Sequence, residues 1–187
     1  MISKTKHLFF LILFSFFLPT SVLARNLVIK SLGHSSFLIK GEGTSILINP
    51  FKAKGCASNL VEPKERNADF ILASSRLLDE GYNPNNKLMF VEPGTYKYKD
   101  ILLNGIPVPH DRVGGRRFGM ATVWSWEQNN LKIVHMGGAA GDIDINSQIV
   151  LASPDILFIS IGGGKKSYNG KEASRIVKTL KPSIVIP

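Results

Sequence analysis

The chain has 187 residues, a formal net charge of +9 and a hydrophobic content of 44%. This length is sufficient for one domain with its own core. The only cysteine, Cys56, excludes an intrachain disulfide framework. The basic bias is compatible with an anionic partner, and it bears on solubility and non-specific binding more than on the fold.

The first 24 residues have the organisation of a secretory signal peptide. Two lysines precede the apolar run Leu8–Leu18, and small residues in "PTSVLA" end the segment at Ala24. The alternative is an uncleaved membrane anchor, but the run is well short of the roughly 20 apolar residues that a spanning helix needs. We therefore expect cleavage after Ala24, a mature domain over 25–187, and a periplasmic or secreted protein without a membrane anchor.

Strands and hairpins dominate the first half of the mature chain. The segment 26–51 predicts three short strands, and "GEGT" is the turn between "SFLIK" and "SILIN". "FILAS" and "KLMFV" predict two further strands. "KDILLNGIPVPH" alternates apolar residues in places, and its NG dipeptide predicts a turn at Asn104-Gly105.

The second half predicts another hairpin and then a strand-helix-strand unit. The hairpin is "MATVWSWEQNNLKIVHM", which turns around Gln128-Asn129-Asn130, and "DILFISIGGG" is a buried strand. "NGKEASRIVKTLK" has apolar residues at helical spacing, with Asn169 and Glu172 as an N-cap pair, and "SIVIP" is a last strand. This order predicts two sheets with helices outside them.

Two glycine-rich segments carry positive charge. "GGGKKS" lacks the spacing of a phosphate-binding P-loop and predicts a flexible strand-to-helix turn. "HDRVGGRRFG" is a candidate site for phosphate or another small anion, with Arg112, Arg116 and Arg117 as the binding residues. The alternative is a solvated basic loop.

The mature chain contains three histidines, His34, His110 and His135. They form neither a His-x-His nor an HExxH cluster, either of which would be a strong metal signal. Spacing alone therefore indicates no metal site.

Three segments in the same order resemble the metallo-β-lactamase superfamily, and most closely its L-ascorbate-6-phosphate lactonase-like branch. They are "LGHSSFLIKGEGTSILINPF", "IPVPHDRVGGRRFGMATVWSWEQNNLKIVHMGG" and "DILFISIGGGKKSYNGKEASRIVKTLKPSIVIP". The resemblance implies an α+β (αββα) four-layer sandwich of two mixed sheets with outer helices. The family usually continues past the last strand, so it also implies an incomplete C-terminal part, closed by a homodimer or belonging to a longer gene product.

The family's metal ligands are mostly replaced here. The strand ending at Ala73 should lead into a His-x-His-x-Asp-His turn, and this chain has "SSRLLDE". Ser75 and Leu77 stand at the first two histidine positions, Asp79 is kept, and Glu80 stands at the third. By the same resemblance His110 matches a metal-binding histidine, whereas the bridging aspartate falls on Gly138, and Asn49 stands where the family usually has Asp. His34 and His135 are then expected beside the site as supporting or packing residues.

Three readings follow from these replacements. The first is an exported member without catalysis or a cofactor, acting as a binding or structural protein or vestigial. The second is a hydrolase with a single zinc or manganese ion on Asp79, His110 and perhaps Glu80, attacking an ester, lactone or phosphoester with metal-activated water. The third is an anion-binding module built on the arginines of the basic loop.

Overall fold

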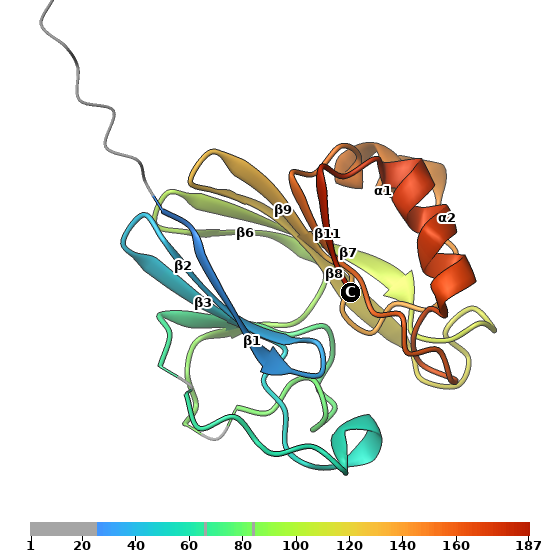
Figure 1. Ribbon diagram of the computed structural model, residues 1–187, viewed down its shortest axis with the longest axis horizontal. Coiled ribbons are helices and arrows are strands. Elements are labelled where there is room, and N and C mark those ends of the chain that lie inside the picture. Colours follow the sequence, from blue (N-terminus) through green and yellow to red (C-terminus); the bar gives the residue numbers. More distant parts are fainter. Residues whose placement is uncertain (1–25, 66, 84) are drawn as a thin grey trace, which may run out of the picture.

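The computed structural model describes residues 26–65, 67–83 and 85–187, so the predicted signal peptide lies outside the described residues. Two β-sheets pack face to face, with two α-helices on the outside (Figure 1). The predicted sandwich of two mixed sheets is confirmed. In the described part of the chain, no helix is long and apolar enough to cross a membrane.

The first sheet has five strands in sequence order. They are β1 (Val28–Gly33), β2 (Ser36–Gly41), β3 (Thr44–Ile48), β4 (Phe70–Leu72) and β5 (Met89–Phe90). The first three are antiparallel, and β4 and β5 continue parallel to β3. The turn between β2 and β3 has positive φ at Glu42 and Gly43, as the predicted hairpin requires. The short 3-10 helix η1 (Gly55–Ala57) follows β3.

The second sheet has six strands in the order β11-β10-β9-β8-β7-β6. In chain order they are β6 (Gly94–Tyr98), β7 (Ile101–Pro109), β8 (Met120–Gln128), β9 (Leu131–His135), β10 (Ile156–Phe158) and β11 (Ile184–Ile186). The predicted hairpin of β8 and β9 is confirmed, and it turns at Asn129 and Asn130, which have φ of 55° and 58°.

The predicted turn at Asn104-Gly105 is wrong, because β7 runs straight through both residues. Gly105 pairs with Trp124 on β8. A Cβ at Gly105 would lie 2.9 Å from Cζ3 of that indole. The glycine therefore makes room for a buried tryptophan, and the hairpin turn comes earlier, between β6 and β7, where Lys99 has a φ of 51°.

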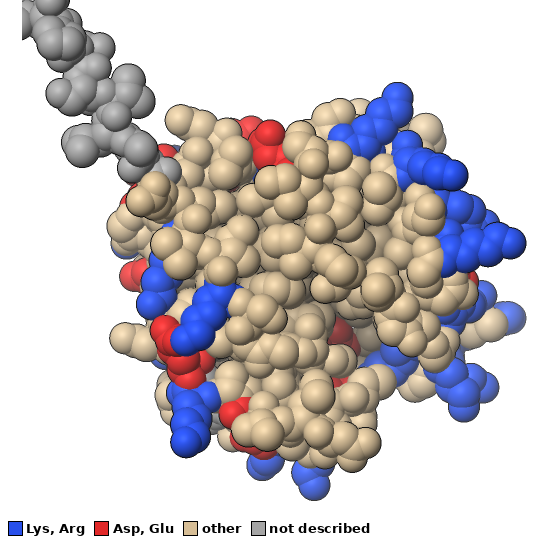
Figure 2. Space-filling model, in the orientation of Figure 1, with Lys and Arg blue, Asp and Glu red and all other residues tan. Residues whose placement is uncertain are grey.

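The helices are α1 (Ile145–Leu151) and α2 (Gly170–Leu180). The capping box of Asn169 and Glu172 forms as predicted at the start of α2. The sequence reasoning did not predict α1, which begins after Asp144 as its N-cap. Both helices cover the second sheet, while the described residues outside the first sheet are loops and η1 (Figure 1). Many of the lysine and arginine side chains gather on the side of the helical layer (Figure 2).

The main core lies between the two sheets and includes both tryptophans, Trp124 and Trp126. A second cluster joins the outer face of the second sheet to the helices through residues such as Val123, Leu151 and Leu180. The sandwich thus fixes the strand ends of both sheets, and the loops that follow those strands, against one another.

Candidate functional site

A cavity of about 590 Å³ opens between the two sheets. It is lined by side chains at the ends of strands and in the loops that follow them. Six residues that the sequence resemblance singled out line this one cavity: His34, Asp79, Glu80, His110, His135 and Gly138. The fold therefore brings together residues that are up to a hundred positions apart in the chain.

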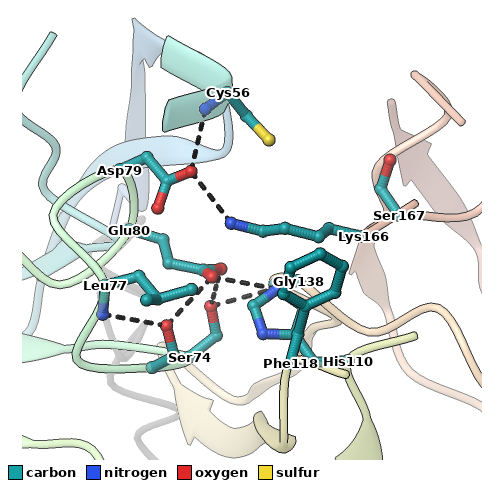
Figure 3. Close-up of polar contacts among 12 residues, drawn as sticks. Cys56, Ser74, Leu77, Asp79, Glu80, His110, Phe118, Gly138, Lys166 and Ser167 are labelled. Carbon is teal, nitrogen blue, oxygen red and sulfur yellow. Dashed lines mark hydrogen bonds and ion pairs between the residues drawn. The ribbon is translucent and has the colours of Figure 1, made fainter. Parts of the chain in front are cut away.

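Glu80 is the centre of a buried hydrogen-bond cluster (Figure 3). Ser74 Oγ donates to Glu80 Oε2 at 2.6 Å, and Ser75 Oγ donates to Oε1 at 2.9 Å. His110 Nε2 lies 3.0 Å from Oε1, and the side chains of this histidine and the glutamate are 1% and 4% exposed. The glutamate therefore points inward, and both of its oxygens already have partners.

The surroundings keep Glu80 ionised. Burial opposes ionisation, but the hydrogen bond and charge of His110 and the two serine hydroxyls outweigh it and hold the pKa of Glu80 below its ordinary value. A carboxylate facing Nε2 at hydrogen-bond distance requires the proton of the imidazole on that nitrogen. His110 Nδ1, also buried, has no partner within the described ranges.

Gly138 stands where the resemblance implies a bridging aspartate, and it has no room for a side chain. A Cβ at this position would lie 2.3 Å from His110 Nε2 and 2.5 Å from Glu80 Oε2. Atoms separated by so little must move apart, since ordinary contact begins near 3.4 Å. The pair of His110 and Glu80 thus occupies the space into which a ligand from position 138 would project.

Asn49 and Ser74 hydrogen-bond each other beside the pair of His110 and Glu80, and Ser74 contacts Glu80 directly. Asn49 Nδ2 donates to Ser74 Oγ at 2.9 Å, and Ser74 N donates to Asn49 Oδ1 at 2.8 Å. Gly138 N lies 3.3 Å from the same hydroxyl and donates to it. Asn49 has a φ of 43°, a left-handed conformation that asparagine tolerates better than most residues. Ser74 belongs to the polar turn directly after a buried strand, a common place for a site, but it was not among the predicted site residues.

An ion pair of Asp79 and Lys166 crosses the cavity between the two sheets. Asp79 Oδ2 accepts hydrogen bonds from Cys56 N at 3.0 Å and from Lys166 Nζ at 3.1 Å (Figure 3). The ammonium group also lies 5.6 Å from the centre of the Phe118 ring. Lys166 follows β10 in the segment "GGGKKS", which lacks the P-loop spacing. Its contact with Asp79 was not predicted.

Burial and the neighbouring charges shift the pKa values of Asp79 and Cys56. Burial opposes ionisation of Asp79, but the Cys56 N–H and the ammonium outweigh it and lower the pKa of Asp79. For the Cys56 thiol, burial is the main cause of a raised pKa, so this cysteine does not have the character of a reactive thiolate.

The residues of the cavity do not fit a metal ion as they are arranged. Within 26–65, 67–83 and 85–187, no three His, Cys, Asp or Glu side chains form a group that could hold one. The donor chemistry explains this result, because both Glu80 oxygens are hydrogen-bonded, Asp79 faces an ammonium, and position 138 offers no side chain. A catalytic zinc typically needs three protein ligands.

His135 and His34 lie at the apolar side of the cavity. His135 Nε2 donates to Ser35 O at 3.0 Å, and its ring contacts Phe37 and Phe158. Complete burial is the main cause that lowers the pKa of His135 to about 4, so the ring is neutral near pH 7. His34 has a φ of 55° and meets Phe51 edge to face.

The basic loop is organised from within. Asp111 accepts hydrogen bonds from four backbone N–H groups of the loop, which lower its pKa to about 2 despite the opposing effect of burial. Arg112 donates twice to Glu172 at 2.7 Å and also to Ser167 O and Gly164 O. Its guanidinium therefore ties the loop to α2. Arg116 and Arg117, the other two predicted anion-binding residues, are exposed.

The chain matches the family model described as "Beta-lactamase superfamily domain" over residues 28–187. No curated protein matches it significantly. Among solved structures, a candidate zinc-dependent hydrolase of the metallo-β-lactamase superfamily from Thermotoga maritima is 21% identical, with a TM-score of 0.67 over 87% of this chain and 75% of the other.

Two further solved structures have the same fold. The metallo hydrolase Igni18 from Ignicoccus hospitalis is 18% identical, with a TM-score of 0.60 over 86% of this chain and 81% of the other. The diiron β-hydroxylase CmlA from Streptomyces venezuelae is 14% identical, with a TM-score of 0.61 over 86% of this chain and 44% of the other. These similarities establish a shared fold.

Proposed function

Because the chain belongs to the beta-lactamase superfamily, we propose that it is an exported member that binds a ligand without hydrolysing it, at a centre closed by its own side chains. The observation that carries this proposal is the lack of space for a Cβ at Gly138. The position of an expected metal ligand can carry no side chain while His110 and Glu80 are paired.

Both carboxylates that a metal could bind already have partners in the cavity. A buried carboxylate without a partner is strongly destabilising. Here His110 faces Glu80, and Lys166 faces Asp79. A divalent cation entering beside Asp79 would have to displace the ammonium, because like charges at such short range repel each other strongly.

The cavity itself remains, and its lining supports a small anionic ligand with an apolar body. Phe37, Phe158 and Ile159 form an apolar wall, and Lys165 and Lys166 line the cavity as well. The cavity also contains Asp79 and Glu80, but these carboxylates are paired with Lys166 and His110. Pockets of this size with an apolar wall and convergent polar groups are typical of small-molecule sites.

Metal content and metal affinity of the purified protein test this proposal. We expect mass spectrometry to find far less than one zinc or manganese per folded chain, and calorimetry to detect no tight binding of either ion. In Lys166→Met the repelling ammonium is gone, so zinc affinity should rise, whereas Lys97→Met, an exposed control on β6, should behave as the wild type. One metal per chain in the wild type, lost in His110→Ala, would refute the proposal.

The second candidate is a hydrolase with one metal ion. The observation in its favour is that Asp79, Glu80 and His110 line the same cavity. If these side chains rearranged, a zinc or manganese ion bound there would supply activated water for an ester, lactone or phosphoester. Activity that depends on added metal and disappears in His110→Ala would establish this function instead.

A further inference from the structure

The outermost surface of the helical layer combines exposed aliphatic side chains with a row of cations. On α1, Ser147 and Leu151 face the sheet and are buried. Ile145 and Ile149, on the opposite side of the helix, are 67% and 68% exposed. Large aliphatic side chains that project so far into water gain nothing from the fold itself.

On α2 the cations Lys171, Arg175 and Lys178 lie at positions i, i+4 and i+7 and are all exposed. Like charges at this spacing lie on one helix face and destabilise an isolated helix slightly. Glu172, the acidic residue in the first turn, hydrogen-bonds Arg112 and also interacts electrostatically with Arg175, so it offsets the row only in part. The exposed face of α2 thus carries three cations against this one carboxylate and is net positive.

Both helices bury one side against the second sheet, so their exposed sides face away from it. A groove of about 650 Å³ is lined by Gln148 of α1 and by Arg175 and Thr179 of α2, and its lining also includes the acids Asp111, Asp142 and Glu172. We name the residues on either side of it the outer helical face: Ile145, Ile149, Lys171, Arg175 and Lys178. Figure 2 shows lysine and arginine side chains crowded along this side of the molecule.

We propose that the outer helical face docks the protein on an anionic lipid surface. Cations near such a surface are attracted by its negative potential, and aliphatic side chains beside them enter the boundary between headgroups and acyl chains. A second copy of the chain fits less well, because a symmetric contact would place one cationic row against the other. Nucleic acid would be held by the cations, but it offers nothing for the two isoleucines to bury.

Vesicle sedimentation with the full chain tests this docking. Vesicles of phosphatidylcholine alone are compared with vesicles containing one-third phosphatidylglycerol. The apolar run Leu8–Leu18 would partition into either kind of vesicle, so the measured quantity is the ratio of the two partition coefficients. We expect a ratio of at least roughly a hundred at low salt, at about fivefold per cation, that falls steeply as salt is raised to about 0.5 M.

Three sets of substitutions identify the surface. Lys171→Gln, Arg175→Gln and Lys178→Gln together should lower the ratio on the order of a hundredfold, at about fivefold per cation. The matched control, Lys54→Gln, Lys64→Gln and Lys97→Gln, removes the same charge from other exposed sites and should change it much less. Ile145→Ser with Ile149→Ser should lower partitioning into the anionic vesicles severalfold.

The outcomes separate docking on lipid from its alternatives. Equal losses in the two charge variants would overturn the proposal, because net charge alone would then explain binding. Binding that duplex DNA abolishes by competition, with no effect of the isoleucine substitutions, would assign the face to nucleic acid. Neither result bears on metal content, so this inference and the proposed function stand or fall separately.

Discussion

Replacing Gly138 by alanine is expected to lower the free energy of unfolding by about 2–4 kcal/mol. The new Cβ would lie 2.3 Å from His110 Nε2 and 2.5 Å from Glu80 Oε2. The imidazole is 1% exposed, so it can yield only by moving against its packed neighbours or into the cavity that it lines. Overpacking of this kind costs about 1–3 kcal/mol. Relief by separating the pair would cost the buried Glu80 carboxylate its hydrogen bond to His110, a loss of about 1–3 kcal/mol.

Urea denaturation followed by tryptophan fluorescence measures this effect, since Trp124 and Trp126 are both buried. With a slope of about 2 kcal/mol per molar urea, the midpoint should fall by about 1–2 M. Gly170→Ala is the control, because a Cβ there has no neighbour within 4 Å and the residue starts α2. This variant should be as stable as the wild type or slightly more stable.

A double substitution shows whether the clash is with the histidine. In a His110→Ala background the ring is absent, so adding Gly138→Ala should cost less than it does in the wild type. The reasoning would be refuted if Gly138→Ala stayed within about 0.5 kcal/mol of the wild type. It would also be refuted if the two substitutions were simply additive.

Three further predictions concern single groups. The pKa of His135 is about 4 in the folded protein and near 6.5 in the unfolded chain, so the free energy of unfolding falls by about 2 kcal/mol between pH 7 and pH 5. In His135→Phe, urea titrations at the two pH values should show a smaller difference. An unchanged difference would contradict the assignment to His135. Asp111→Asn should speed the amide hydrogen exchange of Gly115 and Phe118 by at least about tenfold, because the charged acceptor for their N–H groups is gone. NMR measures these rates, and unaltered rates would mean that the carboxylate does not organise the loop. Lys166→Met should raise the pKa of Asp79, seen by NMR titration of its carboxyl carbon, since burial is then opposed mainly by one backbone N–H; a pKa equal to that of the wild type would show that the ion pair does not form in solution.

Much of the fold could be predicted because its signals are local. The hairpins at Glu42-Gly43 and Asn129-Asn130 follow from turn residues that accept positive φ, and α2 follows from its capping pair and apolar spacing. The error at Asn104-Gly105 has the opposite cause. The Asn-Gly dipeptide suits a turn, but here Gly105 leaves space for the indole of Trp124, which lies nineteen positions later on the neighbouring strand.

The site could be predicted only in part. Resemblance located Asp79, Glu80 and His110, and the structure places all three in one cavity. It could not show that Glu80 turns inward, since this depends on the hydroxyls of the preceding turn and on an imidazole thirty residues away. Lys166 lies 87 residues from Asp79, and no pattern in the sequence links the two.

The packing at Gly138 also restricts the order in which this centre could change. An aspartate placed at 138 while Glu80 and His110 are paired meets both side chains, so that single substitution is selected against through stability alone. Glu80 would first have to change, and the His110 ring would have to move, before the space is free. A metal ligand at position 138 is therefore tolerated only after the neighbouring side chains have changed, so the order of the substitutions matters.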